Sequence, residues 1–191
     1  MSLAAAGVSS FGPFGAVAAL ALLAASLFAI WAGAYAPDLL LPLAKDENWN
    51  ERLIAHEAAH FLVGYLMGVP VLRYSTSAGA APEVEFDASI GPLAGYLDSR
   101  QALDAFCLVC CGGVAGEGLL WEGSRGGQAD LEALEKAMDN WRGPELEEEE
   151  RFELTRWGVF YAASMLRLHG ASWKALRKAM ASGKDVCGCI E

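Results

Sequence analysis

His56-Glu57-Ala58-Ala59-His60 contains two of the three histidines of this 191-residue chain. The surrounding residues predict a helix, and positions i and i+4 of a helix lie on the same face. His56 and His60 can therefore bind one metal ion from the same side. Glu57, one position further round the helix, can reach a metal-bound water and accept its proton. The pentapeptide thus predicts a metal site in which each polar residue has a role.

The flanking residues bear on this interpretation because they are mostly apolar. Arg52-Leu53-Ile54-Ala55 precedes the pentapeptide, and the segment from Phe61 to Met67 follows it. The alternative is an ordinary helix with two partly exposed histidines and a solvated glutamate. Polar side chains buried in an apolar helix need partners, since unpaired buried polar groups are costly. A metal ion would be such a partner, which favours the metal site.

The composition limits the classes of function that the chain can have. Its length is enough for one domain with a core, or for a small domain with an appendage. The formal net charge of −10 argues against nucleic acid as a partner. We therefore do not expect DNA or RNA to be a partner of this protein.

The N-terminal region is predicted to span a membrane. After a short segment over residues 1–10, residues 11–36 are almost wholly apolar or small, and the first charged side chain is Asp38. A helix over residues 11–36 would be about 39 Å long, enough to cross a bilayer with some tilt. A cleaved signal peptide is the alternative, because Ala34-Tyr35-Ala36 resembles a cleavage site, although no basic residue precedes the apolar run. A buried soluble helix is a third possibility, but few such helices lack a polar face.

One face of this predicted transmembrane helix carries small residues at every fourth position. They are Ala21, Ala25, Ala29 and Gly33. Such faces let membrane helices approach closely, so we expect a partner membrane protein to pack there. Basic residues follow the apolar segment and none precedes it, which favours a C-terminal domain on the cytoplasmic or stromal side.

The remainder of the chain is predicted to be a mainly α domain with a small β element. We expect a linker over residues 37–49 and a single domain over residues 50–191. Hydrophobic periodicity and Gly or Pro stop signals predict the elements of that domain. The predicted helices cover 50–67, 99–121 with an interruption or tightening at Gly112-Gly113, 129–141, 147–168 and 172–180, and the predicted strands cover 71–75 and 83–87.

A hydrolytic zinc site needs a third protein ligand besides two histidines. His169 is one candidate, but a basic residue at a helix end also interacts favourably with the helix dipole. The acidic candidates are Glu117, Asp130, Glu85 and Asp87. Spacing alone does not choose between them.

Three motifs resemble the peptidase domain of FtsH-type zinc metalloproteases. The segment from Glu51 to Gly68 is similar to the metal-binding helix of that family, which usually reads HEAGH. Residues 111–117 (CGGVAGE) resemble its GGRxAEE helix, and residues 126–131 (GGQADL) resemble its TGAxxDL segment. The aspartate of that last segment is the third zinc ligand in the family, so the match nominates Asp130. The resemblance covers roughly residues 50–190 and implies a helical, zincin-like fold.

The chain departs from the family pattern in several places. Ala59 replaces a glycine, Val114 replaces the arginine of the second motif, and Gly118 stands in for its second glutamate. The connection from Glu117 to Asp130 is shorter than usual. No GxxxxGK[ST] motif is present in the sequence, so the ATPase module of the family is missing. The chain resembles stand-alone, membrane-anchored relatives of plants and algae, which implies a chloroplast thylakoid or envelope location with the domain on the stromal side.

The resemblance implies a mechanism and also leaves an alternative open. His56, His60 and Asp130 would hold Zn²⁺ with a fourth position for water, and Glu57 would act as general base and then acid. The expected substrate is a polypeptide, cleaved in unfolded or flexible segments without an ATPase of the protein's own. The alternative is a protease-fold subunit that serves the structure or assembly of a membrane complex, for instance a photosynthetic one, with little or no activity.

The five cysteines suggest a second, competing metal site. Cys107 and Cys110 form a CxxC, and Cys187 and Cys189 form a CxC near the C-terminus. Four thiolates could bind a metal, but the two pairs lie far apart in the sequence. Core packing is the simpler interpretation of Cys107, Cys110 and Cys111, because free cysteines behave as small hydrophobes. The terminal pair is expected to be redox-active, as a disulfide or a thiol sensor.

Overall fold

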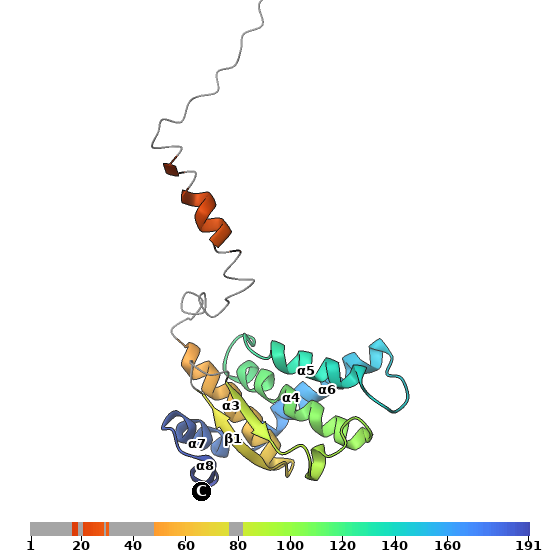
Figure 1. Ribbon diagram of the computed structural model, residues 1–191. Helices are drawn as coiled ribbons and strands as arrows, with labels where there is room; N and C mark the ends of the chain where they lie inside the picture. The colour runs from red at the N-terminus through yellow and green to blue at the C-terminus, as the bar shows by residue number, and fades with distance from the viewer. Residues whose placement is uncertain (1–16, 19–20, 29, 31–47, 77–81) are drawn as a thin grey trace, which may run out of the picture. The chain divides into compact units, whose positions relative to one another are not determined.

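The computed structural model describes residues 17–18, 21–28, 30, 48–76 and 82–191 (Figure 1). The chain divides into two compact units, residues 1–47 and residues 48–191. In the first unit the described residues are helical and exposed to solvent. The rest of the predicted transmembrane helix, the predicted segment 1–10 and most of the predicted linker lie outside the described residues. Ala29 and Gly33 of the predicted partner-binding face lie outside them as well.

The second unit is mainly α with one small sheet, as the sequence predicted. Its helices are α3 (Trp49–Leu66), η2 (Gly91–Leu93), α4 (Arg100–Leu120), α5 (Gln128–Asp139), α6 (Glu148–Leu168), α7 (Gly170–Ala181) and α8 (Val186–Ile190). Strands β1 (Val71–Ser75) and β2 (Glu83–Phe86) form a two-stranded antiparallel sheet in which Arg73 pairs with Glu85 and Tyr74 with Val84. The α8 turn was not predicted, because five residues are too few to show helical periodicity.

Helix α3 lies at the centre of this unit. It contacts α4 and α6 on one side and the sheet and α7 on the other (Figure 1). Residues 55–64 of α3 are all buried, and the polar side chains of the pentapeptide are among them. The helix ends at Leu66, and Gly68 follows with a positive φ of 79° that suits glycine. The Gly68 N–H donates to the Tyr65 carbonyl.

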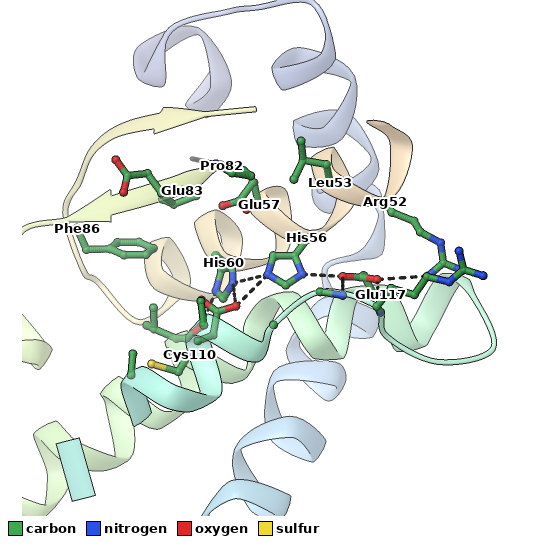
Figure 2. Close-up of a pocket in the computed structure, with 18 of the residues that line it drawn as sticks. Arg52, Leu53, His56, Glu57, His60, Pro82, Glu83, Phe86, Cys110 and Glu117 are labelled. Atoms are coloured by element: carbon green, nitrogen blue, oxygen red, sulfur yellow. Dashed lines mark hydrogen bonds and ion pairs between the residues drawn. The ribbon is translucent and has the colours of Figure 1, made fainter. Parts of the chain in front are cut away.

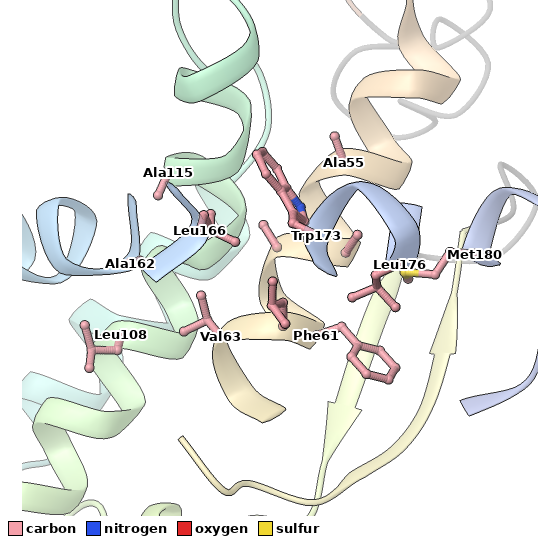
Figure 3. Packing of buried hydrophobic residues seen from close by; sticks show 13 residues of the cluster. Ala55, Phe61, Val63, Leu108, Ala115, Ala162, Leu166, Trp173, Leu176 and Met180 are labelled. Carbon is pink, nitrogen blue, oxygen red and sulfur yellow. The ribbon is translucent and has the colours of Figure 1, made fainter. Parts of the chain in front are cut away.

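The core around α3 is built from aliphatic and aromatic side chains of four helices. Phe61 and Val63 of α3 meet Leu108 of α4, Leu166 of α6 and Trp173 of α7 (Figure 3). Burial of these side chains stabilises the fold by about 1.5–3 kcal/mol for each large residue. The metal motif therefore lies on a helix that packs into this core.

Helix α4 is the one helix among the described residues that is long and apolar enough to cross a membrane. Of its most apolar stretch, 67% is buried inside the unit, so it is a core helix. The predicted interruption at Gly112-Gly113 was wrong, because α4 runs unbroken from Arg100 to Leu120. These glycines serve packing rather than helix termination.

Candidate metal centre

His56, His60 and Asp130 bring one ligand atom each to within 4.8 Å of one another. Figure 2 shows the two imidazoles side by side. The Nε2 atoms of the two histidines lie 3.0 Å apart. Asp130 Oδ2 lies 3.0 Å from Nε2 of His56 and 3.3 Å from Nε2 of His60. Helix α3 supplies both imidazoles from one face, and the first turn of α5 supplies the carboxylate. The structure thus brings the predicted ligand set together.

The opposite ring nitrogens fix the tautomer of both histidines. Nδ1 of His60 lies 2.7 Å from the carbonyl oxygen of Val109, which can only accept, so this Nδ1 carries the proton. Nδ1 of His56 lies 2.8 Å from Oε1 of Glu117 and donates to that carboxylate. When both rings are neutral, their Nε2 atoms therefore present lone pairs to each other and to Asp130. Such partners are usual for histidines that bind metals.

A cation between these three acceptor atoms would relieve the repulsion between their lone pairs. A proton on Nε2 of His56 would bond to Asp130 but leave Nε2 of His60 facing acceptors. A divalent ion would satisfy all three atoms at once. Ligand atoms 2.0–2.2 Å from a tetrahedral zinc lie about 3.3–3.6 Å apart, a few tenths of an ångström more than most of the observed separations. The group could therefore hold a metal ion, and its two nitrogens and one oxygen leave a position open for water.

The pKa values of His56 and Asp130 also show that a positive charge is favoured at this position. Burial lowers the pKa of His56, but hydrogen bonds to Asp130 and Glu117 outweigh burial and raise it to about 9. Burial raises the pKa of Asp130, yet the hydrogen bonds from His56 and His60 outweigh burial and lower it well below its usual range. Asp130 is therefore a carboxylate at neutral pH, as a metal ligand must be.

Glu117 anchors the site from α4. Its Oε1 accepts from His56 and from the Gly126 N–H at 3.1 Å, and its Oε2 accepts from the Arg125 N–H at 2.9 Å and from Arg52 at 3.3 Å. Burial raises its pKa, but the hydrogen bonds from His56 and the backbone outweigh burial and lower it to about 2. Glu117 thus orients His56 and fixes the loop that leads to Asp130, rather than binding the metal.

Two glycines of α4 let this helix approach the histidines. A Cβ atom on Gly113 would lie 2.2 Å from Nε2 of His56, and one on Gly112 would lie 3.2 Å from Cα of His60. Any larger residue at position 113 would displace the imidazole. The Gly112-Gly113 pair therefore explains how α4 and α3 pack closely enough to form the site.

Glu57 lies beside the ligand group and faces a cleft of about 510 Å³. Its side chain is 4% exposed, and burial raises its pKa above the usual range. Within the described part of the chain, no hydrogen-bond donor contacts its carboxylate. Glu57 is thus a buried carboxyl group that has no hydrogen-bond donor among the described residues and is directed toward the cleft (Figure 2).

The walls of the cleft are largely apolar. They come from α3, β2, α4 and α5, and the β2 side approaches α3 closely because the Phe86 ring packs over Gly64. A Cβ atom on Gly64 would lie 2.2 Å from that ring. The apolar lining residues are Trp49, Leu53, Pro82, Val84, Phe86, Phe106, Val109, Cys110, Ala129 and Ala133.

The three remaining candidates, Glu85, Asp87 and His169, are not part of the ligand group. Glu85 pairs with Arg73 on the sheet, and Asp87 accepts from Ser89 at the end of the hairpin. His169 lies at the junction of α6 and α7. Among the residues that the structure describes, His56, His60 and Asp130 form the one group with metal-binding geometry.

Two parts of the site had no role in the sequence interpretation. The Val109 carbonyl fixes the tautomer of His60, and no sequence signal marks a backbone carbonyl. Arg52 donates to Glu117 and lies over the Trp121 ring at 4.6 Å. Arg52 precedes His56 by four residues and so lies on the same helical face, and this spacing could have indicated that Arg52 belongs to the site.

The cysteines do not assemble a second metal site in the described residues. Cys107, Cys110 and Cys111 are buried in α4, as predicted, and Cys107 donates to the Leu154 carbonyl at 3.4 Å. A hydrogen bond to Cys111 and burial raise the pKa of the Cys107 thiol, which keeps it protonated. Redox activity of the exposed Cys187 and its neighbour Cys189 stays a prediction.

Comparisons with models of known protein families and with curated proteins give no match to this sequence.

Proposed function

We propose that this protein is a membrane-anchored, zinc-dependent metallopeptidase that hydrolyses unfolded or flexible protein segments without an ATPase of its own. The convergence of His56, His60 and Asp130 beside Glu57 carries the proposal. Two histidines, one carboxylate and an adjacent unpartnered glutamate form the residue set of a hydrolytic zinc centre. The resemblance to FtsH-type peptidases supports the same conclusion from the sequence.

Each residue of the site would have a separate role in hydrolysis. His56, His60 and Asp130 would hold Zn²⁺, which supplies Lewis acidity to a water and to the peptide carbonyl. Glu57 would accept the water proton and deliver it to the leaving amine. Its burial favours this role, because a raised pKa makes the carboxylate a stronger base. Glu117 and the Val109 carbonyl would keep both imidazoles in the tautomer that binds metal.

The substrate would bind as an extended peptide along β2. Pro82, Glu83, Val84 and Phe86 line the cleft, and β1 occupies one edge of β2. The other edge of β2 is unpaired in the described two-stranded sheet. Edge pairing would hold the peptide backbone beside the ligand group. A cleft of this size admits a single strand, which limits cleavage to flexible segments.

The location is part of the proposal. Residues 11–36 would anchor the protein as a single-pass membrane protein, with the small-residue face meeting a partner membrane protein. The resemblance to stand-alone plant and algal relatives supports a chloroplast thylakoid or envelope location, with the peptidase domain on the stromal side.

A second candidate function is a structural or assembly role in a membrane complex. Large side chains exposed on α6 favour it, because Trp, Tyr and Phe are typical of protein interfaces. Phe152, Trp157, Phe160 and Tyr161 are 39–69% exposed. A scaffold subunit would use this face and would not need Glu57.

A peptidase assay on the purified full chain tests the proposal. Hydrolysis of unfolded casein should stop when zinc is removed with a chelator and return when zinc is restored. A zinc-loaded, folded protein that cleaves no unfolded substrate would instead support the scaffold function.

A further inference from the structure

A second cavity adjoins the cleft at the metal centre. This cavity, of about 340 Å³, is lined by α4, α5 and the turn before α4. Phe106 and Ala133 line both cavities, so the two are adjacent, and we refer to them together as the groove. The groove runs from the ligand group along α5, away from β2.

The positions of residues along α5 give the distance from the metal centre to each part of the groove. Asp130 stands at the metal centre, Ala133 lies where the cavities join, and Lys136 and Asn140 line the second cavity. Six residues of helix separate Asp130 from Lys136, an axial rise of about 9 Å. An extended peptide advances about 3.3 Å per residue, so Lys136 lies roughly three residues from the bond at the metal centre.

The two ends of the groove differ in charge. At the β2 end, Glu83 and Glu85 are paired with Arg73. In the second cavity the basic residues are Lys136 and Arg142, and Arg142 is paired with Asp98 at 3.0 Å. In the described part of the chain no carboxylate pairs with Lys136. Its ammonium is therefore the charge that remains available to a bound peptide.

We propose that the groove selects peptides with an acidic side chain about three residues from the scissile bond, and that Lys136 binds that side chain. This inference rests on the proposed peptidase function, since it assigns a substrate class to the same centre. Exposed charge pairs are weak, so the preference is modest and falls as salt is added.

Peptide binding to the zinc-loaded, full-length Glu57→Gln variant tests the preference without turnover. The probes are fluorescent nine-residue peptides with an apolar centre in a Gly/Ser background, with Glu, Gln or Lys three positions to either side of that centre. We expect one Glu peptide to bind about fivefold more tightly than its Lys counterpart at low salt. Lys136→Glu in the same background should abolish or reverse this preference.

The matched control is Lys178→Glu, because Lys178 also lies in the last turn of a 12-residue helix, α7, and does not line the groove. This variant should keep the preference for Glu. Equal binding of Glu and Lys peptides, or a preference that survives Lys136→Glu, would overturn the inference. A preference that depends on Lys136, together with no cleavage by the wild-type protein, would support the groove and refute the peptidase function.

Discussion

Glu57 and Glu117 are two buried carboxylates near His56, and their surroundings move their pKa values in opposite directions. Glu117 accepts hydrogen bonds from His56, Arg52 and two backbone N–H groups, and its pKa falls to about 2. Glu57 has no such donors within the described residues, and burial raises its pKa. Donors, rather than burial, therefore decide which carboxylate stays charged.

This difference assigns a separate role to each carboxylate. A carboxylate with four donors is fixed in place and charged, which suits an anchor for a metal-binding imidazole. A carboxylate without donors, at the edge of a cleft, is free to take up and release a proton. Changing each residue in turn should therefore have distinct effects.

The largest effect is expected from Glu57→Gln. Peptide hydrolysis should fall by about 10²–10⁴-fold, because the general base is lost. Zinc content should stay at the wild-type level, and the melting temperature should be equal or higher, since an unpaired buried carboxylate is removed. Steady-state kinetics, metal analysis and thermal unfolding measure these three quantities. Wild-type turnover by this variant would show that Glu57 is not the base.

Glu117→Gln should mainly affect metal binding. Loss of the charged partner of His56 should weaken zinc affinity by about 10–100-fold, measured by competition with a chromophoric chelator. Glu122→Gln is the matched control, because it removes the same charge from an exposed position five residues away. Equal zinc affinities of the two variants would contradict an anchoring role for Glu117.

Gly113→Ala tests the close approach of α4 to the histidines. The added Cβ would lie 2.2 Å from Nε2 of His56, so we expect a stability loss of about 1–3 kcal/mol and weaker zinc binding. Gly118→Ala has no atom within 4 Å of its Cβ and should instead stabilise α4 by about 0.5–1 kcal/mol. Chemical denaturation of both variants measures the difference, and a neutral Gly113→Ala would argue against this packing.

The smallest effect is expected from pH on the metal-free protein. Burial lowers the pKa of His56, but its carboxylate partners raise it from 6.5 to about 9. A raised pKa in the folded state stabilises the fold fully below pH 6.5, and this stability is lost as the pH rises through 9. The melting temperature of the chelator-treated protein should therefore fall between pH 6.5 and pH 9.5. The melting temperature of the zinc-loaded protein should fall less over the same pH range, since the metal replaces the proton on His56.

Sequence reasoning predicted the parts of this molecule that depend on local pattern. The α3 helix, the two strands and α6 follow from periodicity and stop signals, and i, i+4 spacing places His56 and His60 on one face. Asp130 came from the family resemblance, because 70 residues separate it from His60 and no local rule joins them. The continuous path of α4 was missed, since the glycines that usually weaken a helix serve here to admit an imidazole.

Metal analysis of the purified full chain and its Asp130→Ala variant tests the central claim most directly. The account predicts one tightly bound zinc per wild-type chain and a large loss of zinc from Asp130→Ala, while the variant keeps its helical circular dichroism. A folded wild-type protein that binds no zinc, or an Asp130→Ala variant that retains zinc with unchanged affinity, would contradict it.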